Sequence, residues 1–487
     1  MLLYGDAFGD PAVAAPNLAT RAAAGSLVEW HLGGTSSAMA LPQGLYRIVL
    51  RALRALSPVL MKGESKLARG LRGRHDAHTR LAAAATALAD RPVVWVHAAS
   101  VGESLQARAV IDVLRGRMPG LQVVFTFFSP SAEVMHGSFP ADVSSYLPWD
   151  LPEVMGPVLD AVRPAVIVFT QREVWPTLAE EAAARGVPTV LIAGTMPQGA
   201  GRLSRPGRIL LGPAFRSLRA VAAVSKEDGD RFGLLGVRGD RVTVTGDPGI
   251  DAVWDRAARI DRGAPHMRIF GAMRMLGSGS RGAGGPILVA GSTWPSDEKV
   301  LIPALARVRR SVPGLRLVLA PHEPGGYDFV GLGRRLAADG WTPVLLGKSG
   351  AVQGVDAILV DRVGVLADLY SLASVAYVGG GFHGSGLHSV VEPAAVGVPV
   401  LMGPRYRGSV HAARLLAAGG ACAVADVNGL ADTLREWLED VKKNEERGRL
   451  AMDYIEKQRG AADCTADLIT RLLPQENRRG TLSEGET

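Results

Sequence analysis

The stretch VVWVHAASVGESLQAR, residues 93–108, combines a predicted strand, a tight turn and the start of a helix. Residues 93–96 form a short apolar run rich in β-branched side chains, which predicts a buried strand. The turn that follows carries almost no side-chain bulk, and Glu103 stands where a helix can begin. A carboxylate there can stabilise the helix dipole, and it can also serve as the base of an active site. The local sequence leaves both interpretations open.

Short apolar runs alternate with helical stretches along the rest of the chain. In the first half these runs lie at 121–129, 165–170, 188–194 and 220–225, and a second series begins at 286–293 and continues at 315–322, 342–347, 357–361, 375–381 and 399–404. Regular alternation predicts a parallel sheet with helices on both faces. We therefore expect an α/β protein with two doubly wound, Rossmann-like domains and a ligand cleft at their carboxyl strand ends.

Length and composition narrow the function classes. The chain has 487 residues, too many for one compact core, so two domains are expected. Its 59 glycines follow no period, which excludes collagen-like and solenoid folds. The two cysteines, Cys422 and Cys464, offer neither a disulfide framework nor metal-ligand spacing. The net charge of +7 favours an anionic partner: nucleic acid, anionic lipid or a phosphorylated substrate.

The distribution of the basic residues favours a lipid surface over nucleic acid. Arg47, Arg51 and Arg54 recur at helical spacing within an otherwise apolar run, which argues against a membrane-spanning helix and favours one lying in a membrane interface. The alternative is a surface helix that packs on its own domain. Residues 1–40 show no signal-peptide pattern and are expected to be a disordered extension.

The stretch GGGFHGSGLHSVVEPAAVGVPVLMGP, residues 379–404, predicts a phosphate-binding loop in the second half. Gly381 and Gly386 belong to a glycine-rich loop that lets a ligand approach the backbone. A helix is expected to begin near His388 and Ser389, with Glu392 one turn inside it, placed to bind ribose hydroxyls. The alternatives are a dinucleotide-type loop or a structural turn.

Polar residues also follow other predicted strands. Ser292 and Thr293 end one strand and offer hydroxyl and N–H groups to a phosphate, although helix capping explains them equally. His322 ends the next strand, where a lone histidine is more often structural. In the first half, Glu173 follows a strand beside Arg172, as a catalytic carboxylate or as part of a salt-bridged turn.

Taken in order, these stretches resemble the Kdo (3-deoxy-D-manno-octulosonic acid) transferases, glycosyltransferases of lipopolysaccharide assembly with the two-domain GT-B fold. The resemblance runs from about residue 45 to 473 and includes HAASVGE, REVWP, VTVTGDPGID, AGST, APHEP and the glycine-rich stretch above. We expect the following organisation: a disordered extension over 1–40, a basic amphipathic membrane-associating helix over 41–75, an acceptor-binding Rossmann-like domain over 76–258, a linker or mobile loop over 259–285, a donor-binding Rossmann-like domain over 286–473 and a disordered tail over 474–487.

The resemblance implies roles for individual residues. Glu103 would be the general base and Glu173 a second catalytic carboxylate, with Ser100, Gly102 and Arg172 on the acceptor side. The donor would be CMP-Kdo, bound by Ser292, Thr293, His322, Gly381, Gly386, His388, Ser389 and Glu392. The acceptor would be a lipid A precursor on the anionic surface of the inner membrane, at its cytoplasmic face. Transfer would invert the anomeric centre without a metal, a cofactor or a nucleic acid partner.

The sequence departs from the family pattern at Gln171, where the family has glutamate, at Gly249 or its neighbours, where a lysine is common, and at Ser389, where asparagine is common. Two alternatives therefore stay open: a nucleotide-sugar epimerase on the same fold, and a membrane-docked binding scaffold that has lost catalysis. A dinucleotide oxidoreductase is disfavoured, because no GxGxxG motif opens the first strand–helix unit.

Overall fold

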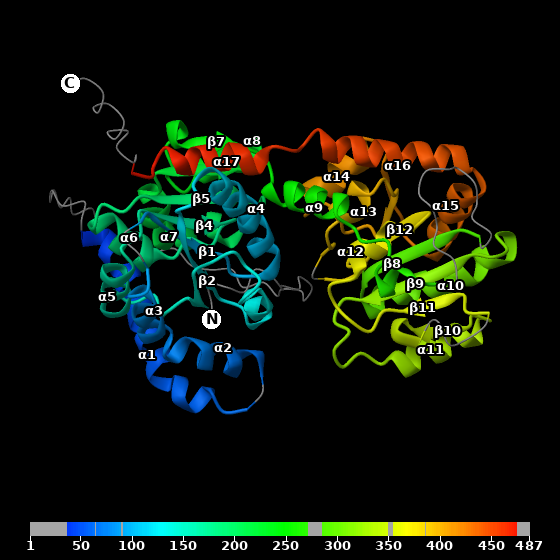
Figure 1. Ribbon diagram of the computed structural model, residues 1–487, viewed down its shortest axis with the longest axis horizontal. Coiled ribbons are helices and arrows are strands. Elements are labelled where there is room, and N and C mark those ends of the chain that lie inside the picture. Colours follow the sequence, from blue (N-terminus) through cyan, green and yellow to red (C-terminus); the bar gives the residue numbers. More distant parts are fainter. Residues whose placement is uncertain are drawn as a thin grey trace, which may run out of the picture. The chain divides into compact units, whose positions relative to one another are not determined.

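The computed structural model describes residues 37–63, 65–88, 91–270, 285–348, 354–384 and 386–474. The chain divides into two compact units (Figure 1). The N-terminal unit holds the described residues of Val13–Ala252 and of Arg459–Thr487, and the C-terminal unit holds those of Val253–Gln458. Within the described residues, the chain passes from one unit to the other after Ala252 and after Gln458.

The N-terminal unit is built on a parallel sheet of seven strands in the order β3-β2-β1-β4-β5-β6-β7. The strands are β1 (Val93–His97), β2 (Gln122–Phe127), β3 (Val143–Tyr146), β4 (Val166–Thr170), β5 (Thr189–Gly194), β6 (Ala220–Ala223) and β7 (Val242–Val244). Strand β1 is buried along its whole length. Its alternate side chains enter two different cores: Val93 and Trp95 lie on one face of the sheet, and Val94 and Val96 on the other.

Helices cover both faces of this sheet. The connecting helices are α3 (Ala77–Ala85), α4 (Val101–Arg117), α5 (Pro152–Val162), α6 (Pro176–Ala184), α7 (Arg205–Ser217) and α8 (Lys226–Gly233), with short 3-10 turns η2 (Pro130–Met135), η3 (Gly201–Leu203) and η4 (Gly239–Arg241). Side chains of α3, α5, α6 and α7 share one core, and those of α4 lie in the other. This arrangement is the doubly wound layer structure that the alternating sequence pattern predicts.

The C-terminal unit repeats the architecture with a second parallel seven-stranded sheet, ordered β10-β11-β9-β8-β12-β13-β14. Its strands are β8 (Ile287–Thr293), β9 (Arg316–Pro321), β10 (Pro343–Leu345), β11 (Ala357–Leu359), β12 (Val375–Val378), β13 (Val400–Met402) and β14 (Ala421–Ala423). Its helices are α10 (Pro295–Ser311), α11 (Phe329–Ala338), α12 (Leu366–Tyr370), α13 (Val391–Ala395), α14 (Val410–Ala417), α15 (Val427–Glu439) and α16 (Val441–Glu456), with η5 (Pro265–Met267) and η6 (Leu346–Lys348). Helix α9 (Pro248–Ala258) carries the chain from one unit into the other.

The expected single helix over 41–75 is two helices. Helix α1 (Ser37–Leu60) ends before Gly63, whose positive φ of 95° breaks the path, and α2 (Lys66–His75) follows with Ser65 as its N-cap. Among the described helices, none combines the length and the apolar character needed to cross a bilayer.

We expect from the sequence that the arginine stripe of α1 is available to lipid headgroups, but two of its arginines pair with carboxylates of the same unit. Arg47 pairs with Glu180 at 2.6 Å, and Arg51 makes two hydrogen bonds of 2.9 Å to Glu153, so both arginines bind the chain's own carboxylates. The large apolar side chains left exposed on this helix are Leu45, Ile48, Val49, Leu56, Val59 and Leu60. Helix α1 therefore docks on its own unit through ion pairs and keeps an apolar face outward.

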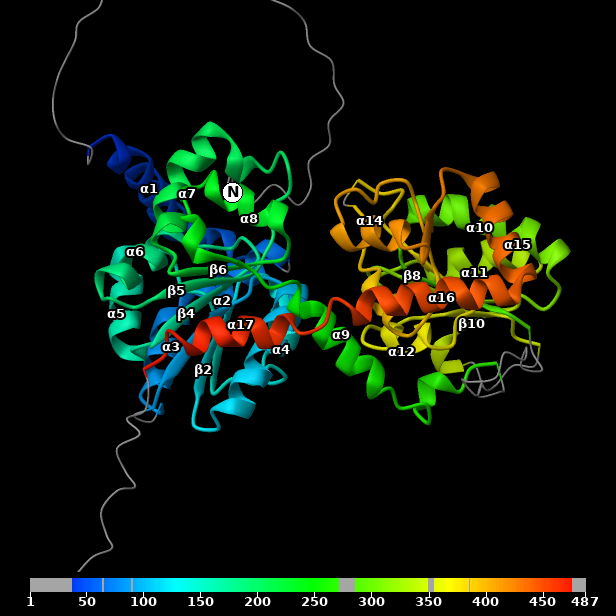
Figure 2. The ribbon, with the colours of Figure 1, turned by 90° about the horizontal axis from the view of Figure 1, so that it is seen from above.

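The last helix, α17 (Ala461–Thr470), corrects the expected domain boundary at residue 473. It packs beside α4 in the N-terminal unit (Figure 2), where Ala462, Ala466 and Ile469 join the core on that face of the sheet. Asp251 fixes its start by accepting hydrogen bonds from the N–H groups of Gly460 and Ala462, at 2.7 and 2.8 Å. The C-terminal unit thus ends at Gln458.

Three expectations lie mostly outside the described residues: the disordered extension over 1–40, the tail over 474–487 and most of the linker over 259–285. Within that linker, the described residues Pro265–Met267 form η5, and Met267 and Ile269 pack into a core of the C-terminal unit.

Candidate functional site

The candidate residues of the N-terminal unit lie at the point where its strand order reverses. Strands β1 and β4 are neighbours, although two strands separate them in the sequence. Glu103 follows β1 in the first turn of α4, and Glu173 follows β4. In open α/β sheets, ligands bind outside the carboxyl ends of the strands at such a reversal. The fold therefore brings the two predicted carboxylates to the sheet edge where ligands bind.

The turn before α4 holds the Glu103 carboxylate. Ser100 is the N-cap, and the Glu103 carboxylate folds back to accept a hydrogen bond from the Ala99 N–H at 2.9 Å and one from the Ser100 hydroxyl at 3.2 Å. Burial, and then the charge of Glu173, raise the pKa of Glu103 to about 7. A carboxylate with a pKa near neutrality is well suited to general-base work at neutral pH. Glu103 is both a capping residue and a candidate base.

Glu173 is held by a buried ion pair. Its Oε1 accepts a hydrogen bond from Nη2 of Arg202 at 2.8 Å, and the two side chains are 13% and 11% exposed. Burial raises the pKa of Glu173, while Arg202 and Arg172 act to lower it. Arg172 also lowers the pKa of Glu103, so it lies close enough to influence both carboxylates.

The same edge of the sheet has open space at Gly102 and an unusual backbone conformation at Gln171. A side chain at Gly102 would meet no atom within 4 Å, which leaves the first turn of α4 open beside Glu103. Gln171, an expected departure from the pattern of the resembled family, adopts a left-handed backbone with φ of 57°. Its amide donates to Oε1 of Gln106 at 2.9 Å, and Gln106 donates in turn to Asp247 at 2.8 Å. Asp247 also accepts from the N–H of Gly249 at 2.8 Å.

Gln171 and Gly249, two of the expected departures, both take part in this series of hydrogen bonds. A glutamate at 171 could not donate to Gln106, whereas Gln171 can, and so it links the turn after β4 to α4. Gly249 is held by Asp247 at the start of α9.

His97, a buried neutral histidine, connects the turn after β1 to the segment after β4. His97, at the end of β1, is fully buried, and burial followed by the charge of Arg74 lowers its pKa to about 3. Its Nε2 accepts a hydrogen bond from Trp175 at 2.9 Å, and its Nδ1 lies 3.1 Å from the Thr126 hydroxyl. Trp175 comes from the stretch after β4, so this bond joins the two strand ends that carry Glu103 and Glu173.

The candidate residues of the C-terminal unit occupy the corresponding edge. Strands β8 and β12 are neighbours at the reversal of strand order, and Ser292 and Thr293 end β8 while the three glycines 379–381 follow β12. The backbones meet closely there: a Cβ at Gly379 would collide with the carbonyl oxygen of Ser292, and one at Gly381 would lie 2.5 Å from Cα of Gly403. Only glycine fits these two positions without moving the neighbouring backbone.

Four aromatic rings gather at this edge. The Trp294 ring stacks on His383, with centroids 4.0 Å apart, and on His322 at 4.7 Å, while His322 stacks on His388 at 4.2 Å. Trp294 Nε1 donates to His388 Nε2 at 3.0 Å, and burial is the first cause that lowers the pKa of His388 to about 4. His388 is therefore neutral at pH 7, with its hydrogen on Nδ1, where it can donate to a ligand.

Asp297 organises the glycine loop from beneath. It is fully buried, and its carboxylate accepts hydrogen bonds from the N–H groups of Gly380 at 2.8 Å and of Phe382 at 3.2 Å, and from the hydroxyl of Tyr377 at 3.1 Å. Asp297 also accepts from the Trp294 N–H at 2.9 Å, so one carboxylate fixes both the loop and the start of α10. The loop is thus pre-organised by the protein itself.

The segment after the loop differs from the expectation in one respect. Helix α13 begins at Val391, not near His388 and Ser389, and it is only five residues long. Glu392 lies in its first turn, and burial raises the pKa of this carboxyl group while Arg256 acts to lower it. The hydroxyl of Ser389 accepts from the Val391 N–H at 3.4 Å. An anion at this edge would accordingly meet loop N–H groups and side chains, not the end of a long helix.

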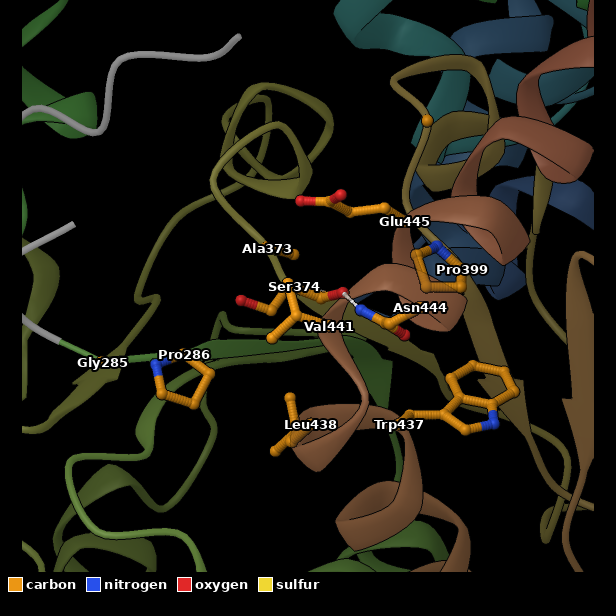
Figure 3. A pocket seen from close by; sticks show the side chains of 11 residues that line it. Gly285, Pro286, Ala373, Ser374, Pro399, Trp437, Leu438, Val441, Asn444 and Glu445 are labelled. Carbon is orange, nitrogen blue, oxygen red and sulfur yellow. Dashed lines mark hydrogen bonds between the residues drawn. The ribbon is translucent and has the colours of Figure 1, made fainter. Parts of the chain in front are cut away.

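A small cavity of about 120 Å³ lies at the opposite edge of the same sheet (Figure 3). Its lining includes Pro286, Ser374 and Pro399, which directly precede β8, β12 and β13, and Asn444 donates to the Ser374 carbonyl there at 2.9 Å. It contains none of the predicted site residues. Within the described part of the chain, no group of three or more His, Cys, Asp or Glu side chains is arranged to hold a metal ion.

Several site residues were not predicted from the sequence. Arg202 lies 29 positions from Glu173 and reaches it only because η3 lies beside the end of β4 in the folded unit. Trp294 directly follows the AGST stretch and His383 lies inside the glycine-rich stretch, but a stacking role has no sequence signature. Asp297 lies in the first turn of α10, and its contact with the glycine loop follows only from the fold.

The comparisons with known proteins agree with this arrangement. Residues 75–252 match the family described as 3-deoxy-D-manno-octulosonic-acid transferase (kdotransferase). The 3-deoxy-D-manno-octulosonic acid transferase of Haemophilus influenzae is 26% identical over 78% of this chain and 87% of its own length. That of Bordetella pertussis is 27% identical over 88% of this chain and 98% of its own.

Solved structures support the fold alone. A UDP-GlcNAc 2-epimerase from Neisseria meningitidis, bound to UDP-GlcNAc, superposes with a TM-score of 0.56 at 13% identity, covering 78% of this chain and all of that one. A putative UDP-N-acetylglucosamine 2-epimerase from Listeria monocytogenes gives the same TM-score at 12% identity, over 78% of this chain and 96% of its own. Two Rossmann-like units with parallel sheets make this a GT-B fold. The family match over residues 75–252 and the sequence relatives indicate that the chain is a glycosyltransferase similar to the 3-deoxy-D-manno-octulosonic acid transferases.

Proposed function

We propose that the protein transfers Kdo from CMP-Kdo to a lipid A precursor, with inversion at the anomeric carbon, at the cytoplasmic face of the inner membrane. The observation that carries the proposal is Glu103. It is a buried carboxylate with a pKa of about 7, at the carboxyl edge of a Rossmann-like sheet beside an unoccupied volume at Gly102. The relatives from Haemophilus influenzae and Bordetella pertussis, named for Kdo transfer, support the choice of sugar.

The transfer needs one proton acceptor and a stabilised leaving group. Glu103 takes the proton from an acceptor hydroxyl as that oxygen forms its bond to the anomeric carbon. The bond between this carbon and the phosphate oxygen breaks, and CMP leaves with the electron pair. General-base assistance of this kind contributes roughly 10²–10⁴-fold to the rate. Ser100, Gly102 and Arg172 lie on the acceptor side, and Glu173 is the second carboxylate of the site.

The donor would bind at the matching edge of the C-terminal unit. Ser292, Thr293, Gly381, Gly386 and Ser389 offer backbone and hydroxyl groups to the phosphate and sugar. His322 and His388 stack at 4.2 Å, and a neutral His388 donates a hydrogen bond without adding charge. Glu392 would accept hydrogen bonds from the ribose hydroxyls.

The outward apolar face of α1 supports the placement at a membrane. Leu45, Ile48 and Val59 are 62%, 62% and 66% exposed, which is unusual for large aliphatic side chains recurring on one helix face. Such a face enters the boundary between lipid headgroups and acyl chains, where the exposed basic residues of α2 attract anionic headgroups. A lipid acceptor would then be available to the N-terminal unit without leaving the bilayer.

The test is to incubate the purified protein with CMP-Kdo and a lipid A precursor and to follow the lipid by mass spectrometry. We expect the mass of one or more Kdo units to be added, and the count gives the stoichiometry. The variant Glu103→Gln should bind CMP as the wild type does and lose transfer by at least 100-fold. Wild-type protein that binds CMP without transfer would support a binding scaffold, and epimerisation of a nucleotide sugar without transfer would support an epimerase. Either result would overturn the proposal.

A further inference from the structure

We propose that Arg202 is a positioning residue for this transfer: by pairing with Glu173 it keeps that carboxylate charged, and the charged Glu173 makes Glu103 the group that takes the proton. The inference rests on the proposed function for its meaning in catalysis. Its geometric basis is one buried ion pair and the different partners of the two carboxylates.

The two buried glutamates are not equivalent. Glu173 has a cation in direct contact, because Nη2 of Arg202 donates to its Oε1 at 2.8 Å with both side chains nearly enclosed. Glu103 accepts only neutral donors, the N–H of Ala99 and the hydroxyl of Ser100. A buried carboxylate keeps its charge far more readily when a guanidinium is bound to it. Burial still raises the pKa of Glu173 overall, but of the two carboxyl groups it is the one that ionises more readily.

The charge of Glu173 then acts on Glu103. Two buried carboxylates at one site cannot both ionise easily, so the proton goes to the one without a cation. The charged groups that act on Glu103 are Glu173, which raises its pKa, and Arg172, which lowers it. The carboxylate of Asp247 faces the next turn of α4, where the Gln106 amide and the Gly249 N–H satisfy it.

The other ion pairs described for α4 lie further along the helix than Glu103. Arg108 pairs with Asp112, Arg115 with Asp142, and Arg117 near the end of the helix with Asp463 and Asp467 of α17. Within the described residues, Arg202 is thus the cation bonded to the carboxylate that controls Glu103.

The proposal fixes the sign of the effect. If Arg202 acts through Glu173, replacing it with a neutral side chain favours the protonated form of Glu173, and the repulsion on Glu103 falls. The pKa of Glu103 should then fall, by on the order of one unit. If Arg202 acted directly on Glu103 as a nearby cation, its removal would raise that pKa. The two routes therefore predict opposite shifts.

The test titrates Glu103 directly. Protein labelled with ¹³C at the glutamate carboxyl carbon is followed by NMR between pH 4 and 9, and the Glu103 resonance is assigned by its loss in Glu103→Gln. We expect Arg202→Gln and Glu173→Gln each to lower the midpoint by about one pH unit. Arg202→Lys, which keeps the charge, should keep the wild-type midpoint. The matched control is Arg205→Gln, an exposed arginine three positions further along.

A double variant tests whether Arg202 acts on Glu103 only through Glu173. If Arg202 acts only through Glu173, the variant carrying both Arg202→Gln and Glu173→Gln titrates with the midpoint of Glu173→Gln alone. It also avoids leaving a buried charge unpaired, so it remains informative if Arg202→Gln alone folds poorly. An unchanged or raised midpoint in Arg202→Gln, or a double variant that differs from Glu173→Gln, overturns the proposal.

The titration needs no substrate, so it is independent of the proposed function. Wild-type protein that fails to transfer Kdo while the midpoints shift as expected would refute the assigned reaction and leave the ion-pair inference standing. Active wild-type protein whose Glu103 midpoint ignores Arg202 would do the reverse. In an active protein, the acid limb of the kcat/KM profile should move with the NMR midpoint, because that limb reports the essential base of the free enzyme.

Discussion

The variant Glu103→Gln should make the protein more stable, and increasingly so as the pH rises. Glu103 has a pKa of about 7 in the folded protein against an ordinary value of 4.5, so the folded state binds the extra proton between these values. Above pH 7 the carboxylate is charged in both states and destabilises the folded one. One pKa unit corresponds to about 1.4 kcal/mol, so the cost reaches about 3 kcal/mol at pH 8 and falls to about 1 kcal/mol at pH 5.

Glutamine removes this cost because it keeps the shape and an oxygen that accepts the Ala99 hydrogen bond, but carries no charge. For a unit of this size about 1 kcal/mol moves Tm by roughly 2–4 °C. Calorimetry should therefore show a Tm gain of roughly 6–12 °C at pH 8 and of roughly 2–4 °C at pH 5 for the transition of the N-terminal unit.

The matched control is Asp112→Asn, which neutralises an exposed carboxylate on the same helix, 55% exposed and paired with Arg108. Its effect on Tm should be small and equal at the two pH values. A gain for Glu103→Gln that is the same at pH 5 and pH 8, or larger at pH 5, would refute the reasoning. Gained stability together with lost transfer would place Glu103 among residues whose strain serves activity.

Three further predictions concern other parts of the molecule. Gly102→Ala should raise Tm, because its Cβ meets no atom within 4 Å and alanine favours the helix by about 0.5–1 kcal/mol. The same variant should lose transfer if the acceptor occupies the space beside Gly102. The control Gly116→Ala, in the last turns of the same helix, should give the gain in Tm and keep full activity. Trp294→Leu removes the hydrogen-bond donor to His388 and the central ring of the cluster. Calorimetry should then show at least tenfold weaker CMP binding with the C-terminal unit still folded. An unchanged Kd for CMP would exclude the ring cluster from the donor site. The Asp150 carboxylate accepts three hydrogen bonds, one of them from the hydroxyl of Tyr46 on α1 at 2.8 Å. Asp150→Asn should therefore lower the free energy of unfolding by about 1–3 kcal/mol in urea titrations. An unfolding midpoint equal to that of the wild type would contradict the role of the Tyr46 bond in docking α1.

The sequence predicted the strands that are buried on both faces and, among the edge strands, only β10. Residues 93–96 and 165–170 are continuous apolar runs, and the structure confirms them as β1 and β4. The strands β3, with the sequence VSSY, and β14, with ACA, are short and carry polar or small side chains. Periodicity gives almost no signal over three or four such residues.

The site was predictable where strand ends carry its residues, and not where distant elements complete it. Thr293 ends a strand, Glu173 lies in the turn after β4 and Glu103 lies in the first turn of the helix after β1, so parallel topology brings them to the carboxyl edges. Arg202 arrives from a 3-10 turn between β5 and α7, and its partner can be read only from the folded sheet order. Likewise, the stripe of arginines on α1 indicated its amphipathic character, but the acids that bind Arg47 and Arg51 come from α6 and α5.

The return of α17 to the N-terminal unit has a consequence for biosynthesis. The core between α4 and the sheet is completed by Ala462, Ala466 and Ile469, which leave the ribosome only after the whole C-terminal unit. While that unit is being translated, the apolar surface of α4 around Val110 and Leu114 has no cover from α17, and Asp251 has no helix to cap. Domains generally fold in the order in which they emerge from the ribosome. Here the N-terminal unit emerges first, but its core is completed only when α17 has been synthesised. A nascent chain halted before residue 461 should therefore expose a binding surface for chaperones that the finished protein lacks.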